Sequence, residues 1–116
     1  MNRKFRIISS DDYKRVRRLG KPYAHPLAVI IVTEGQAQNS RAGIITGKSI
    51  GKAVQRNRVK RRLRAILSNA MVKTRSPYDI VVIARNAINA ASFAEIRSMV
   101  LVQLRKAGIL EYDDGR

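Results

Sequence analysis

Residues 52–64 of this chain read Lys-Ala-Val-Gln-Arg-Asn-Arg-Val-Lys-Arg-Arg-Leu-Arg. From this stretch onward, apolar side chains recur at helical spacing and form one stripe, made of Val59, Leu63, Ile66, Leu67 and Ala70. The spacing predicts an amphipathic helix over about residues 52–72. A helix with one apolar stripe must bury it against another layer of secondary structure, so this segment decides how the chain folds.

The same helix concentrates positive charge. Residues 35–78 contain eleven Lys and Arg but no Asp or Glu. Arg56, Lys60 and Arg64 follow one another at intervals of four, and each such like-charge pair costs an isolated helix about 0.2–0.5 kcal/mol. Because the like charges on this helix repel one another, the pattern indicates that a bound anion neutralises them. Repeated phosphates are the commonest candidate.

Length and composition narrow the class of protein. The chain has 116 residues, a formal net charge of +16 and no cysteine. We expect a single domain over residues 1–116, with a basic tail at 1–8 and a frayed tail at 111–116. The high positive charge predicts that it binds a polyanion. The lack of cysteine is compatible with a reducing compartment such as the cytoplasm. An anionic membrane surface is the competing partner. The basic helix is embedded between strand-like segments, which favours nucleic acid over a membrane.

The segments around the basic helix predict the remaining elements. Two capping-box patterns, Ser9 with Asp12 and Ser92 with Glu95, begin helices that Gly20 and Gly108 close. Apolar, β-branched runs predict strands at residues 27–33, 42–46 and 78–84. We expect the second of these strands to form a hairpin with the first, the third to be central, and residues 21–26 to be a loop.

The order of the predicted elements is helix, strand, strand, helix, strand, helix. This αββαβα order predicts an α+β fold, a two-layer α-β sandwich with two helices on one face of a small mixed sheet. The other face of the sheet would then stay partly open and offer a second contact surface.

No enzymatic constellation is present in the sequence. The chain has one histidine, His25, in a predicted loop, and its eight acidic residues are dispersed. We therefore predict no catalytic residue and no metal ligand. Residues 47–51, Gly-Lys-Ser-Ile-Gly, depart from a nucleotide-binding phosphate loop because position 42 is alanine. The backbone of that loop and Lys48 could instead meet phosphates at the start of the basic helix.

Two local features suit RNA. In residues 56–58, Arg-Asn-Arg, the guanidinium groups can bind phosphate in a fork and stack on unpaired bases, and the amide can donate and accept at a base edge. The alternative interpretation of this charge run is a solvated face. Tyr13 could stack on a base, or it could be a half-exposed aromatic of the first helix.

Residues 53–64 closely resemble the signature helix of the bacterial ribonuclease P protein component. Residues 41–51 resemble the strand and glycine-rich loop that precede that helix, residues 78–85 resemble the family's third strand, and residues 12–20 resemble its first helix. The resemblance covers about residues 5–110. It implies a fold like domain 2 of ribosomal protein S5, with a left-handed βαβ crossover through the basic helix.

The resemblance also implies a function. The family's protein is the small subunit of a ribonucleoprotein endonuclease that removes 5′ leaders from precursor tRNA. In that particle the RNA subunit performs the hydrolysis with Mg²⁺, which the RNA subunit and the substrate mainly hold. The protein supplies affinity for the leader, helps the RNA to fold and lowers the magnesium requirement. No further protein partner and no membrane are implied, and the location is cytoplasmic.

Matched position by position, the resemblance assigns two sets of residues. Those expected to contact the RNA subunit are Arg56, Asn57, Arg58, Lys60, Arg61, Arg62 and Arg64 of the helix, with Lys48 and Lys52 beside them. Those expected at the leader are Tyr13, Arg17 and Ile30. Arg17 and Ile30 stand where the family often has aromatic residues, so leader contact is expected to rely more on charge here.

Two other functions share the high charge. A structural ribosomal protein can have this fold, and it would co-sediment with ribosomal subunits at high salt. A non-specific DNA-binding module would bind duplex DNA as well as structured RNA. All three would lose affinity steeply with salt, so salt dependence alone does not separate them.

Overall fold

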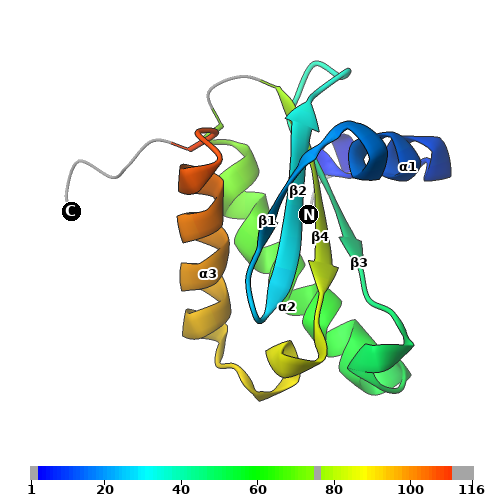
Figure 1. Cartoon of the computed structure of the whole chain (residues 1–116), viewed down its shortest axis with the longest axis vertical. Helices are drawn as coiled ribbons and strands as arrows, with labels where there is room; N and C mark the ends of the chain where they lie inside the picture. Colours follow the sequence, from blue (N-terminus) through cyan, green and yellow to red (C-terminus); the bar gives the residue numbers. More distant parts are fainter. Residues whose placement is uncertain (1–2, 75–76, 111–116) are drawn as a thin grey trace.

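The computed structural model describes residues 3–74 and 77–110. Three helices and one sheet make up the fold (Figure 1). The helices are α1 (Ser10–Leu19), α2 (Ala53–Met71) and α3 (Phe93–Lys106). The strands are β1 (Lys21–Ala24), β2 (Ala28–Glu34), β3 (Arg41–Ile45) and β4 (Tyr78–Ala84). Short 3₁₀ turns lie at η1 (Arg3–Phe5), η2 (Lys48–Ile50) and η3 (Asn86–Ala90).

The strands follow the order β1-β2-β4-β3 across the sheet. The prediction that residues 78–84 form a central strand is confirmed, because β4 pairs antiparallel with β2 and parallel with β3. The predicted hairpin between the first two apolar strands is wrong. The strand at 41–45 joins the far edge of β4, and β2 pairs with β4 and β1 instead.

Strand β1 occupies residues that were predicted to be a loop. It pairs antiparallel with β2, and Pro22 lies opposite Ile31. Proline cannot donate to a ladder on its nitrogen side and is tolerated at the edge of a sheet, which is where β1 lies. A four-residue edge strand with proline and little burial carries no apolar periodicity, so the sequence pattern could not reveal it.

The connection from β3 to β4 runs through α2. Both strands point the same way in Figure 1, and α2 crosses behind the sheet while the chain moves from the outer strand inward. This makes the crossover left-handed, as the resemblance implied. General packing rules favour the opposite hand in nearly all such units.

Helices cover the two faces unequally. Helices α2 and α3 pack on one face over a core that includes Ile30, Leu63, Ile80 and Leu104, as predicted for two helices. The opposite face carries α1, and its apolar cluster is small: Ile7, Val16, Ile31 and Val81. The second face is therefore partly covered by α1 and partly open. Residues 3–8 do not form a free tail, because Ile7 is buried in this second cluster.

The helix ends follow their capping residues with one exception. The Ser92–Glu95 capping box is confirmed, and hydrogen bonds from Ser92 lower the pKa of Glu95. Gly108, at φ 79°, takes the left-handed conformation just after α3. Ser9 caps α1 by accepting from the Asp11 N–H, but Asp12 is not its capping partner. The Asp12 carboxylate instead pairs with Arg15 and Arg41.

Candidate nucleic-acid interface

Helix α2 separates an apolar side from a cationic side. The predicted stripe is buried, with Met71 added to it. Asn57, Arg58, Arg61 and Arg64 are exposed on the helix surface, and Arg56, Lys60 and Arg62 are half-buried. The sequence pattern therefore located the charged face correctly.

The positive charge on α2 has no carboxylate partner in the part of the chain that the structure describes. Within residues 3–74 and 77–110, no Lys or Arg of α2 forms an ion pair with a carboxylate. The ion pairs found there join Arg15 and Arg41 to Asp12 and Asp79, on the other face of the sheet. Mutual repulsion along α2 is thus left for an external anion to relieve.

One side of α2 borders a groove of about 510 Å³. Its lining comes from α2 and the N-terminal segment, and comprises Arg6, Asn57, Lys60, Arg61, Arg64, Ala65 and Ser68. The segment is held at the edge of β3 by a backbone hydrogen bond of 3.0 Å from the Ile7 N–H to the Ala42 carbonyl. Sequence reasoning did not single out Arg6, although the basic N-terminal tail was the signal for it.

On the opposite side of α2, part of the charged surface contacts the protein itself and stabilises the fold. Arg62 Nη1 donates to the Ala91 carbonyl at 3.2 Å and so ties α2 to the segment that leads into α3. Arg58 lies beside it, next to Ile88 and Ile96. The predicted contact residues therefore divide: Asn57, Lys60, Arg61 and Arg64 share the groove, whereas Arg58 and Arg62 lie outside it.

The glycine-flanked loop places two lysines at the start of α2. Lys48 lies in η2, Lys52 is the N-cap of α2, and both are exposed. Two side chains from η3 hold the loop: Asn86 Nδ2 donates to the Ser49 carbonyl and Asn89 Nδ2 to the Ile50 carbonyl, each at 2.7 Å. These asparagines come from far along the chain, and no local pattern marked them.

The open face of the sheet carries Tyr13. Its ring lies directly against Gly43 of β3, because a Cβ built on that glycine would meet the ring and its hydroxyl at 2.5–2.6 Å. Tyr13 is half-buried, and Arg17, one turn later on α1, is exposed. The structure thus places Tyr13 and Arg17 together on the surface.

Ile30 does not join them, and its assignment to the leader surface is wrong. Its side chain is 0% exposed and lies in the core beneath α2 and α3. Neighbouring side chains of a strand point to opposite faces, so Val29 and Ile31 face α1 instead.

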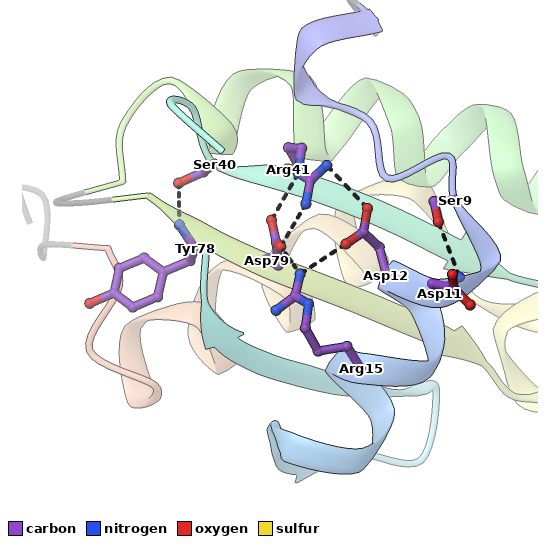
Figure 2. Close-up of polar contacts among 8 residues, drawn as sticks. All are labelled: Ser9, Asp11, Asp12, Arg15, Ser40, Arg41, Tyr78 and Asp79. Carbon is purple, nitrogen blue, oxygen red and sulfur yellow. Dashed lines mark hydrogen bonds and ion pairs between the residues drawn. The ribbon is translucent and has the colours of Figure 1, made fainter. Parts of the chain in front are cut away.

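An ion network lies between α1 and the sheet (Figure 2). Arg41 of β3 binds Asp79 of β4 in a fork, with Nε to Oδ1 at 3.1 Å and Nη2 to Oδ2 at 2.8 Å. Arg15 of α1 also pairs with Asp79, and Asp12 contacts both arginines. Hydrogen bonding to Asp79 raises the pKa of Arg41 although partial burial opposes the shift. These two arginines are therefore neutralised within the protein.

Together, the fold and this surface define a class: a small α+β domain with a cationic helix and an adjoining groove at its surface. The model of the Ribonuclease P family matches residues 1–108. This chain belongs to the ribonuclease P protein family.

Individual relatives agree with the family assignment. The ribonuclease P protein component of Syntrophomonas wolfei is 37% identical over 109 residues, covering 94% of this chain and 92% of the relative. That of Streptococcus pneumoniae is 32% identical and covers 99% and 94%. The RNase P protein of Staphylococcus aureus superposes with a TM-score of 0.83 at 26% identity, covering 92% and 98%. That of Thermotoga maritima gives 0.77 at 27% identity, covering 87% and 96%.

The described residues do not fit a resident Mg²⁺ ion. Among residues 3–74 and 77–110, no group of three or more histidine or carboxylate side chains is placed to hold a metal. Asp12 and Asp79 lie close together, but arginines occupy their oxygens. In the same part of the chain, no helix has the length and apolarity needed to cross a membrane.

Proposed function

We propose that this chain is the protein subunit of a cytoplasmic ribonuclease P particle, which removes the 5′ leader from precursor tRNA. The cationic side of α2, with Lys48 and Lys52, binds the RNA subunit. Tyr13 and Arg17 contact the leader. The RNA subunit cleaves the phosphodiester bond, with Mg²⁺ held mainly by the RNA subunit and the substrate, and no other protein partner is required.

The observation that carries this proposal is the un-neutralised charge of α2 beside a groove. Among the described residues the cations of α2 have no acidic partners. Such a helix binds phosphates favourably, because each contact releases counterions and relieves repulsion between side chains. The planar guanidinium groups of Arg61 and Arg64 suit phosphate oxygens better than a point charge does. Family membership supports tRNA processing as the context in which this surface acts.

A reconstituted cleavage assay tests the proposal. The purified chain, the RNA subunit and a precursor tRNA are mixed over a range of Mg²⁺ concentrations. We expect the protein to stimulate 5′ maturation most strongly at low Mg²⁺, and to show no cleavage without the RNA. Absence of stimulation at low Mg²⁺, together with co-sedimentation with ribosomal subunits at high salt, would favour a structural ribosomal protein instead.

Gly43→Ala tests the leader surface. The added methyl group would overlap the Tyr13 ring, which is the free end of a side chain and can swing away, so we expect the fold to survive and the ring to move. Loss of one base stack costs about 1–3 kcal/mol, so affinity for precursor tRNA should fall by about fivefold or more. Substrate binding is measured with a leader of several nucleotides and with mature tRNA.

The matched control for this variant is Tyr13→Ala, alone and combined with Gly43→Ala. Once the ring is gone, the methyl group has nothing to displace, so the double variant should bind like Tyr13→Ala alone. Additive losses would show that Gly43→Ala acts through the strand and not through the ring.

A further inference from the structure

We infer that Asp79 is a positioning residue, which sets α1 on the sheet so that Tyr13 and Arg17 face the leader. The inference rests on the proposed function, because it concerns the geometry of the leader surface. Sequence reasoning assigned Asp79 only to the start of a strand. The structure places it at the centre of contacts that join α1, β3 and β4 (Figure 2).

Helix α1 has few apolar contacts that could fix its orientation. Of its ten residues only Val16 is fully buried. One apolar side chain resists lifting of the helix from the sheet, but burial is non-directional and leaves rotation about the helix axis poorly determined. A directional constraint must come from polar contacts.

The ion network supplies that constraint. The Asp79 side chain has no exposed surface, and both of its oxygens accept hydrogen bonds from Arg41. Arg15 contacts Asp79 and also Asp12, at 3.2 Å, and Asp12 accepts from Arg41 at 3.3 Å. The four side chains thus form a closed ring, in which two residues of α1 are fixed to two strands. A buried ion pair is weak evidence for stability, and in some proteins buried ionic groups instead fix one arrangement of the chain, which is the role we assign to this ring.

The closed ring of ion pairs and the aromatic side chain of Tyr13 involve the same two elements, α1 and β3. Tyr13 follows Asp12 on α1, and its partner Gly43 lies two residues after Arg41 on the same face of β3. Turning α1 about its axis would break the pairs to Asp79 and lift the Tyr13 ring off Gly43. Arg15 and Arg41 are only 13% and 18% exposed and carry acidic partners, so they position the surface and do not themselves bind phosphate.

Two variants test the inference in the reconstituted holoenzyme. Asp79→Asn keeps the shape and removes the charge. Arg15→Gln removes the direct contact between α1 and Asp79 and leaves the Arg41–Asp79 and Arg41–Asp12 pairs. For each variant we expect affinity for leader-bearing precursor tRNA to fall by about fivefold or more, the loss of one base stack. Affinity for mature tRNA and for the RNA subunit should change by less than about twofold, because a twofold change is well under one such contact.

An NMR measurement reports directly on the position of the Tyr13 ring. In the unaltered protein the ring current of Tyr13 should shift the Gly43 α-proton resonances away from their positions in Tyr13→Ala, since the ring lies against that carbon. Both variants should lose this shift. Val100→Ala, in the core beneath the opposite face, is the control for general destabilisation and should keep the shift and the leader affinity.

The outcomes distinguish the positioning role of Asp79 from the proposed leader surface. A folded Arg15→Gln variant that keeps both the Gly43 shift and the leader-dependent affinity overturns the positioning role, and it does so even if Asp79→Asn fails to fold. If the unaltered holoenzyme shows no preference for leader-bearing substrate, the proposed leader surface fails. In that case the Gly43 resonance alone decides whether Asp79 positions α1.

Discussion

Replacing Arg61 and Arg64 together with alanine should weaken binding of the RNA subunit by about tenfold or more. Both side chains are exposed, line the groove beside Arg6 and lack a carboxylate partner within the described residues. A hydrogen bond to a charged group contributes about 1.5–3 kcal/mol, so the loss of even one phosphate contact reaches a tenfold change. The slope of log affinity against log salt should shrink by about 0.7–0.9 for each phosphate released.

The matched control carries the same change in charge on another surface. Arg97 and Lys106 are exposed on α3, away from the groove, and their double alanine variant also loses two positive charges. We expect it to bind the RNA subunit nearly as well as the unaltered protein. Equal losses in the two double variants would mean that overall charge, and no particular site on α2, sets the affinity. The thermal stability of both variants should stay close to that of the unaltered chain.

Leu63→Ala should lower the free energy of unfolding by about 2–5 kcal/mol. Leu63 is 0% exposed and lies on the inner side of α2, in the core that α2 and α3 share with the sheet. Domains of this size are stable by about 5–15 kcal/mol in total, so the loss is a large share. Urea unfolding measures it, and a change below about 1 kcal/mol would show that the core tolerates the cavity or that Leu63 is misplaced.

Leu63→Ala and the Arg61/Arg64 double variant change opposite sides of one helix. Comparing them distinguishes an effect on folding from an effect on the RNA-binding surface. Leu63→Ala should reduce RNA binding only as far as it reduces the folded fraction. An excess of RNA should therefore restore folding in that variant, because a ligand that binds the folded state stabilises it. The Arg61 and Arg64 pair should show the reverse: normal folding and weakened binding at every RNA concentration.

The parts of the fold that were predicted correctly have strong local signals. Helix α2 has an apolar stripe over about three turns, α3 begins at a capping box, and β4 is apolar from Ile80 to Ala84. The missed strand β1 is short, contains Pro22 and pairs at an edge, so nothing in its sequence distinguishes it from a loop. The partner of β3 was predicted wrongly because strand pairing is set by tertiary packing and not by neighbourhood in the sequence.

In the candidate site, too, features with a local sequence signal were predicted and features set by tertiary contacts were not. The charge pattern located the cationic face of α2, but it could not show that Arg62 bonds a carbonyl 29 residues away. Ile30 was placed on the leader surface, whereas one step along a strand reverses the face and puts it in the core. The role of Asp79 depends on Arg41 and Arg15, which are 38 and 64 residues distant in the chain, and no spacing rule links them.

Site-specific photo-crosslinking tests the central claim most directly, namely that the groove side of α2 is where RNA binds. A photoreactive residue is introduced at Asn57, which is exposed and lines the groove, and separately at Val102, which is 42% exposed on α3. We predict that position 57 crosslinks to the RNA subunit in the reconstituted particle and that position 102 does not. Crosslinks from 102 with none from 57 would contradict the account and place the RNA at α3.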